Sequence, residues 1–182
     1  MPTPRLLAAQ AALLVVDIQE RLCSAMEPQA LERVLNRTGA AIEGAKVLQF
    51  PIFVTEQYPR GLGPTHAQVR ERLGGRKPFE KLAFSAAIPE VIAALEIRKQ
   101  VLLVGMETHI CVFQTARDLV ERGFEVWLCA DAVLSRSAED RRVGLDLCKE
   151  AGARVTTVES ALFDMMGRAG TPEFKVVSAA VR

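Results

Sequence analysis

The sequence predicts a three-layer, doubly wound α/β fold, in which a six-stranded, mainly parallel sheet carries helices on both faces. Short, nearly continuous apolar runs alternate with longer amphipathic stretches along the chain, as in buried parallel strands joined by covering helices. The apolar fraction of 49% and the charged fraction of 25% are typical of a folded globular protein. Because 182 residues suit one hydrophobic core, we expect residues 1–182 to form a single domain.

Five strongly apolar runs and one weaker run are predicted to be strands. They cover residues 12–16, 52–55, 77–81 (the weaker run), 101–105, 124–128 and 154–158. A right-handed doubly wound sheet commonly orders six strands 3-2-1-4-5-6. Strands one and four are then neighbours, and ligands bind beyond their carboxyl ends, after Val16 and Gly105.

Apolar residues recur at helical spacing between these runs. The pattern predicts helices over residues 31–45 and 89–95, from Ile110 to about Gly123, and from a Ser137 cap to Gly152. Residues 57–77 contain several Gly and Pro residues, and we expect an irregular connection there. Because such connections often bind partners, a non-catalytic interaction protein is an alternative to an enzyme.

Charge and composition exclude several function classes. The 23 basic and 22 acidic side chains leave a net charge of +1, so no broad positive field is available for nucleic acid or an anionic membrane. No apolar run reaches bilayer-spanning length, and the N-terminus lacks the features of a signal peptide; we therefore expect a cytoplasmic protein. Asp17 and the three residues after it lack the glycine fingerprint of dinucleotide-binding enzymes.

Cysteine and histidine usage indicates neither a disulfide framework nor a metal centre. The four cysteines include no C-x-x-C pair, and His66 and His109 do not lie at ligand spacing. We expect no bound metal and no cofactor.

Two residues lie at the sheet edge where the predicted fold binds ligands. Asp17 ends the first apolar run, and Cys111 follows the fourth, at the start of a helix toward Glu121. Free backbone N–H groups and the helix dipole at such a start favour a thiolate. Each residue also has a structural interpretation: Asp17 as a turn or cap residue, and Cys111 as a small apolar residue, as we expect for Cys129 and Cys148.

Three separated motifs resemble the isochorismatase-like cysteine hydrolases, a family that includes nicotinamidases and N-carbamoylsarcosine amidase. They are residues 15–19 (VVDIQ), 80–85 (EKLAFS) and 105–116 (GMETHICVFQTA), and the resemblance covers about residues 13–162. A further stretch, residues 55–65 (TEQYPRGLGPT), is similar to the subgroup described only as isochorismatase-domain-containing proteins.

This resemblance implies a catalytic triad of Asp17, Lys81 and Cys111. Cys111 would be the nucleophile and Asp17 the proton shuttle, with Lys81 balancing the negative charge. Local context alone ranks Lys81 only slightly above the other lysines. The resemblance also implies a cis peptide between Met106 and Glu107, with the backbone N–H groups of Glu107 and Cys111 forming the oxyanion hole.

A cysteine nucleophile favours hydrolysis of a small amide-type C–N substrate through a thioacyl intermediate; isochorismatase-type vinyl-ether hydrolysis is the alternative reaction. The paired histidines of metal-binding nicotinamidases are missing, since this chain has Glu56, Gln57 and a lone His66. A redox-active thiol is disfavoured because no second cysteine neighbours Cys111. The residues expected to line the substrate pocket are Gln19, Leu22, Tyr58, Phe84 and Phe113.

The resemblance further implies a homo-oligomer. The apolar stretch over residues 174–181 suits a subunit contact as well as packing within its own domain.

Overall fold

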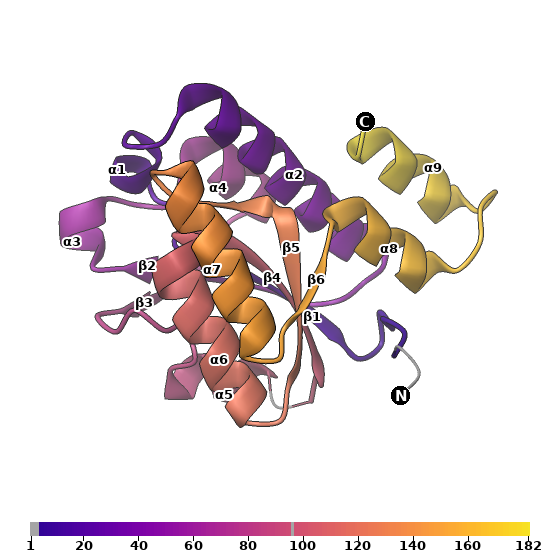
Figure 1. The fold of residues 1–182 in the computed structure, drawn as a ribbon. Helices are drawn as coiled ribbons and strands as arrows, with labels where there is room; N and C mark the ends of the chain where they lie inside the picture. The colour runs from indigo at the N-terminus through magenta and orange to yellow at the C-terminus, as the bar shows by residue number, and fades with distance from the viewer. Residues whose placement is uncertain (1–3, 96) are drawn as a thin grey trace.

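The computed structural model describes residues 4–95 and 97–182. Its strands form one sheet in the order β3-β2-β1-β4-β5-β6, and each pairing between them is parallel. The predicted doubly wound arrangement is therefore confirmed (Figure 1). The strands are β1 (Ala11–Val16), β2 (Ile52–Gln57), β3 (Phe79–Lys81), β4 (Gln100–Met106), β5 (Glu125–Leu134) and β6 (Arg154–Thr156).

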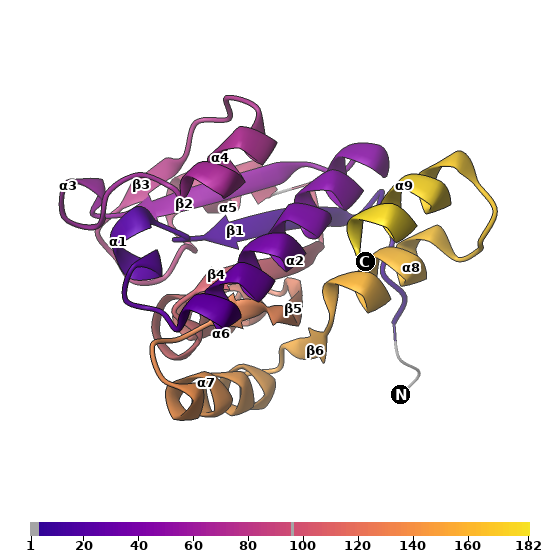
Figure 2. The same cartoon turned by 90° about the horizontal axis from the view of Figure 1, so that it is seen from above.

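Helices cover both faces of this sheet. They are α1 (Glu20–Cys23), α2 (Pro28–Val47), α3 (Pro59–Leu62), α4 (Ala67–Leu73), α5 (Pro89–Leu95), α6 (Phe113–Glu121), α7 (Ala138–Glu150), α8 (Val158–Met166) and α9 (Pro172–Ala180), with a π-helical turn η1 (Thr108–Val112) before α6. Helices α5, α6 and α7 pack on one face, and α2, α4, α8 and α9 on the other. Figure 2 shows α2 running along the sheet, with α8 and α9 near one of its ends.

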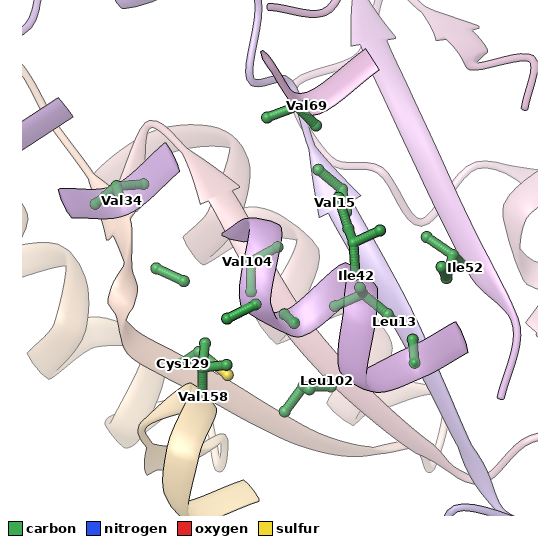
Figure 3. Packing of buried hydrophobic residues seen from close by; sticks show 14 of the residues in the cluster. Leu13, Val15, Val34, Ile42, Ile52, Val69, Leu102, Val104, Cys129 and Val158 are labelled. Carbon is green, nitrogen blue, oxygen red and sulfur yellow. The ribbon is translucent and has the colours of Figure 1, made fainter. Parts of the chain in front are cut away.

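The core divides into two layers because successive side chains of a strand point to opposite faces of the sheet. Leu13 and Val15 of β1 pack with Ile42 of α2 and with alternate residues of β4 (Figure 3). Leu14 and Val16 pack in the other layer, beneath α5, α6 and α7. Every residue of β1 is buried, which explains why its sequence is continuously apolar.

Glycine at position 105 lets the ends of β1 and β4 come together. The two strands pair in register, with Gly105 opposite Val16. A Cβ atom at position 105 would lie 2.2 Å from the carbonyl oxygen of Val16. The backbone φ of Gly105 is 141°, which is unfavourable for residues other than glycine. This close approach brings the loop after β4 beside Asp17, the residue that follows β1.

The predicted irregular connection over residues 57–77 is wrong. It contains α3 and α4. The many Gly and Pro residues of this segment concealed the helical pattern of α4 in the sequence. Val69 and Leu73 lie four residues apart on α4, and both are buried in the layer that α2 covers. A helix forms because this pair buries one apolar face.

Three other boundaries differ from prediction. The strand predicted to reach residue 158 ends at Thr156, because Thr157 caps α8 by accepting a hydrogen bond from Ser160 N. Strand β5 continues to Leu134. The helix predicted from residue 110 begins as the π-helical turn η1, whereas the predicted Ser137 cap of α7 is confirmed.

The C-terminal apolar stretch is partly buried, whereas its Val176 is exposed. Val177 of α9 and the following Val181 are buried in the α2 layer, and the Arg37 guanidinium of α2 donates to the Val181 carbonyl. Among residues 4–95 and 97–182, no helix is long and apolar enough to cross a bilayer.

Candidate active site

The carboxyl ends of neighbouring strands bring three predicted residues together. Asp17 directly follows β1, Lys81 is the last residue of β3, and Cys111 lies in η1, after β4. The Lys81 Nζ atom lies 2.6 Å from Asp17 Oδ2, and both side chains are fully buried. The Cys111 thiol lies within electrostatic range of the same carboxylate, whose charge raises the pKa of the thiol, and it donates a long hydrogen bond to Gln57 Oε1 at 3.9 Å. One carboxylate therefore pairs with an ammonium group and acts electrostatically on a thiol.

All three N–H donors of the Lys81 ammonium group have acceptors. Besides Asp17, it donates to the carbonyl oxygens of Phe84 at 2.9 Å and Ala83 at 3.1 Å. An ammonium group has three donors, so Lys81 has none left for a substrate. Its contribution is its charge and the fixed position that it gives to the Asp17 carboxylate.

The Asp17 carboxylate is held on its other side as well. Thr55 Oγ1 donates to Asp17 Oδ1 at 2.7 Å, and the backbone of Asp17 has a left-handed φ of 51°, which an aspartate tolerates better than most residues. Burial raises the pKa of Asp17 above its ordinary value, although Lys81 and the hydrogen bond from Thr55 oppose this rise. A raised pKa suits a carboxylate that must accept and return a proton.

The Cys111 thiol is not the stabilised thiolate that its position predicted. Burial and the negative charge of Asp17 raise the pKa of Cys111 to about 12, and they outweigh the opposing effects of Lys81 and of a backbone hydrogen bond from Glu107. The free N–H groups of the helix start are not sufficient, since Cys111 lies in a buried π-helical turn. Near neutral pH such a thiol keeps its proton, so it can attack a substrate only if a neighbouring group accepts that proton, and Asp17 is the neighbouring carboxylate.

Backbone and side chain of Glu107 have different surroundings. The Met106–Glu107 peptide is cis, as the resemblance implies, and the Glu107 backbone lowers the pKa of the Cys111 thiol. The Glu107 carboxylate instead accepts hydrogen bonds from the backbone N and Nε of Arg136, at 3.0 and 3.1 Å. The backbone of Glu107, rather than its carboxylate, therefore acts on the Cys111 thiol.

The five predicted lining residues are placed very differently. Gln19 is fully buried, and both atoms of its amide bind backbone groups. Leu22 packs against the core layer that α2 covers, and half-buried Phe113 packs in the layer of Cys111. Tyr58 is 52% exposed and Phe84 51% exposed. Both hydrogen-bond Lys81: Tyr58 N donates to the Lys81 carbonyl oxygen, and the Phe84 carbonyl oxygen accepts from Lys81 Nζ.

Sequence reasoning missed two residues of β2 that complete the site. Thr55 binds the carboxylate of Asp17, and Gln57 Oε1 lies 3.9 Å from Cys111 Sγ. The available signal was their position, since β2 pairs with β1 and Val16 lies opposite Thr55. Residues at the ends of strands adjacent to the switch point therefore belong on any list of candidates.

A large groove of the surface lies elsewhere. A groove of about 1170 Å³ is bordered by α2, the end of β5, the start of α7 and the C-terminus; we call it the arginine groove. Its arginines are Arg33, Arg37, Arg72, Arg136, Arg141 and Arg182. Four of these six, Arg37, Arg72, Arg136 and Arg141, already donate hydrogen bonds to other parts of the chain. None of Asp17, Lys81 and Cys111 borders it.

Metal ligands do not gather at either place. Within the described ranges, no three His, Cys, Asp or Glu side chains lie close enough to hold a metal ion.

Comparison with known proteins gives a consistent set of matches. The family model described as "Isochorismatase domain" matches residues 11–160. The chain is 38% identical to the secreted isochorismatase effector Isc1 of Phytophthora sojae over 98% of its own length and 87% of that protein. It is 39% identical to isochorismatase domain-containing protein 1 of Salmo salar over 97% of its length, but spans only 62% of that relative.

Solved structures show the same fold. The MAR1 ribonuclease of Caenorhabditis elegans has a TM-score of 0.92 and 37% identity, covering 98% of this chain and 92% of that one. YcaC of Escherichia coli, described as an octameric hydrolase of unknown specificity, has a TM-score of 0.83 and 26% identity, covering 92% and 85%.

Proposed function

Because the chain belongs to the isochorismatase family and has its hydrolase fold, we propose that it is a cysteine hydrolase that cleaves the C–N bond of a small amide-type substrate. The observation that carries this proposal is the Asp17 carboxylate, which interacts with both the Lys81 ammonium group and the Cys111 thiol. A nucleophile, a base beside it and a cation that orients the base are the parts that covalent catalysis requires.

In the first half of the proposed reaction, Asp17 accepts the thiol proton while the Cys111 sulfur attacks the carbonyl carbon. The backbone N–H groups of Glu107 and Cys111 stabilise the oxyanion, and each such donor contributes about 3 kcal/mol in acyl-transfer enzymes. The C–N bond then breaks, and the leaving nitrogen takes the proton from Asp17. An amine and a thioester on Cys111 are the products of this half.

In the second half, water attacks the thioester and gives a proton to Asp17. The carbon–sulfur bond breaks, the carboxylic acid leaves, and Asp17 returns the proton to the Cys111 sulfur. Lys81 keeps its proton throughout, because its three donors hold the carboxylate and two carbonyl oxygens. Every proton that moves is thus carried by one carboxylate.

The test is a panel of primary amides, ureas and N-carbamoyl compounds assayed with wild type and Cys111→Ala. We expect Cys111→Ala to lower turnover on the order of 10⁴-fold, because no other group supplies the nucleophile. Cys148→Ala is the matched control, since Cys148 is also a buried thiol but lies on α7. Mass spectrometry of the quenched wild-type enzyme should detect an acyl group on Cys111.

Equal turnover by wild type and Cys111→Ala would remove Cys111 from the mechanism. Hydrolysis of a vinyl ether, with no amide turned over, would favour the isochorismatase reaction instead. A protein that turns over neither class would favour an interaction role for the fold.

We further propose that residues 1–182 form one domain and that the protein assembles with copies of itself. The assembly draws support from the octameric Escherichia coli relative and from the exposed apolar side chains Tyr58, Leu82 and Phe84. Light scattering of the purified protein tests it, and a monomer at micromolar concentration would contradict it.

A cytoplasmic location stays a prediction, because the Phytophthora relative is described as secreted.

A further inference from the structure

We propose that Gln57 is a substrate-positioning residue that binds a neutral N–C=O group beside the nucleophile. This inference rests on the proposed function, because it concerns the substrate of the same site. Gln57 ends β2, and its Oε1 atom accepts a long hydrogen bond from the Cys111 thiol, with 3.9 Å between Oε1 and Sγ. Its Nε2 group makes no hydrogen bond to the described part of the chain. A carboxamide with an available donor therefore faces the sulfur.

The backbone of Gln57 is fixed by a second glutamine. Gln19 Oε1 accepts from Gln57 N at 2.8 Å, and Gln19 Nε2 donates to Gln57 O at 3.0 Å and to Gly63 O at 2.7 Å. Gln19 is fully buried, so these bonds are shielded from water. Gln19 thus acts as a positioning residue, and it leaves only the side chain of Gln57 for a ligand.

Strand geometry directs the Gln57 side chain to the same side as the base. Alternate residues of a strand share a face, so Thr55 and Gln57 point the same way from β2. Thr55 hydrogen-bonds Asp17, and Gln57 reaches Cys111. The chain then turns away at Tyr58, whose φ is 40°, and Gln57 is left at the edge of the site.

The other polar groups at the nucleophile are already occupied. The three donors of Lys81 have acceptors, and the Thr55 hydroxyl donates to Asp17. A substrate carboxylate would therefore meet the Asp17 charge without an available donor from Lys81. A neutral amide or urea offers one acceptor and one donor, which match the two polar atoms of the Gln57 carboxamide.

The experiment measures alkylation of Cys111 by two reagents, with the modified cysteine identified by peptide mapping. Iodoacetamide carries a carboxamide, whereas iodomethane has no hydrogen-bonding group. Both react with the same thiolate, so the ratio of their rates cancels any change in thiol ionisation. In Gln57→Leu we expect the iodoacetamide rate to fall roughly 3- to 10-fold, the effect of a lost neutral hydrogen bond, with the iodomethane rate within about twofold of wild type.

Two further variants make the result specific. Gln57→Glu keeps the side-chain length and an acceptor but loses the Nε2 donor, and we expect the rate ratio to fall in this variant as well. Gln68→Leu is the matched control, because Gln68 lies on α4 and hydrogen-bonds Asn36. Its ratio should equal that of wild type, and far-UV circular dichroism should show all variants folded.

An unchanged rate ratio in both Gln57 variants would overturn the proposal, as would an equal fall in Gln68→Leu. The alkylation readout does not need a hydrolysis substrate. A fall confined to the Gln57 variants, together with no amide turnover in the panel, would therefore reject the proposed function and support Gln57 as an amide-binding group. Where the panel does yield a substrate, Gln57→Leu should raise KM more than it lowers kcat.

Discussion

The candidate active site and the arginine groove each contain a pair of opposite charges, but burial gives the two pairs different energetics. Asp17 and Lys81 are 2.6 Å apart with no exposed side-chain surface. In the groove, Arg37 and Asp131 are 3.6 Å apart, and their side chains are 35% and 26% exposed. Water screens the second pair, whereas removal of one partner from the first leaves a buried, uncompensated charge. Groove size alone therefore does not indicate where the chemistry occurs.

The largest effect that would sharpen this comparison is expected for Asp17→Asn. Loss of the base should lower amide turnover by about 10²- to 10⁴-fold. The same change removes the charge that raises the pKa of Cys111, so the thiol should ionise at lower pH and its alkylation at pH 9 should become faster. Stopped assays and iodoacetamide kinetics on one preparation measure both. Unchanged turnover in Asp17→Asn would contradict Asp17 as the base, and slower alkylation at pH 9 would contradict its charge as a cause of the raised pKa of Cys111.

The next effect concerns the stability of the folded chain. Lys81→Met leaves the Asp17 carboxylate buried without its cation, and we expect the free energy of unfolding to fall by about 3–5 kcal/mol. Urea denaturation measures this change. The double variant Asp17→Asn plus Lys81→Met removes both charges, and it should recover most of the loss. If the double variant is as unstable as Lys81→Met, the cost comes from lost packing of the lysine stem.

The pH dependence of turnover follows from the same pair. Asp17 must be ionised to accept the thiol proton, and burial raises its pKa above the ordinary value of 3.8. The acid limb of kcat/KM should therefore lie above pH 3.8. Because Lys81 lowers the pKa of Asp17, Lys81→Met should move the limb upward by about 1–3 pH units. A limb that stays in place would show that another group controls it.

The raised pKa of Asp17 also sets how the stability of the folded chain changes with pH. A carboxyl group with a raised pKa in the folded state holds its proton more tightly when folded. Its contribution to stability is thus greatest at acid pH and declines as pH rises from about 3.8 through the folded pKa. The stability difference between Asp17→Asn and wild type should change over that window and stay constant above it.

The smallest expected effect belongs to the groove. Arg37→Met removes the partly exposed pair with Asp131, and we expect at most about 1 kcal/mol of lost stability with amide turnover within about twofold of wild type. The same urea titrations and amide assays apply. A loss as large as that of Lys81→Met, or a loss of turnover, would erase the distinction between the two regions.

Two members of the site could be predicted from strand order, and the third could not. Asp17 and Cys111 follow β1 and β4, the neighbours at the switch point of the sheet. Nothing around Lys81 in the sequence separates it from other lysines, and only the family resemblance placed it. Its role depends on carbonyl oxygens of Ala83 and Phe84, which local sequence does not reveal.

The errors in prediction have related physical causes. Helix α4 was missed because one buried pair, Val69 and Leu73, outweighs the surrounding Gly and Pro residues. The thiolate was predicted from the free N–H groups of a helix start, but burial and the charge of Asp17 dominate the pKa of Cys111. Gln57 was missed although it ends β2, because its own residue type predicts no role and its backbone is fixed by Gln19, which lies 38 positions earlier in the sequence.

The contact between Gly105 and Val16 limits which substitutions the end of β4 tolerates. Most positions in β1 and β4 can exchange one apolar residue for another of similar volume at modest cost. No other amino acid fits at position 105, because even the methyl group of alanine would clash with the Val16 carbonyl oxygen. In a saturation library screened for turnover, we expect a single amino acid to survive there, although no atom of its own takes part in the reaction.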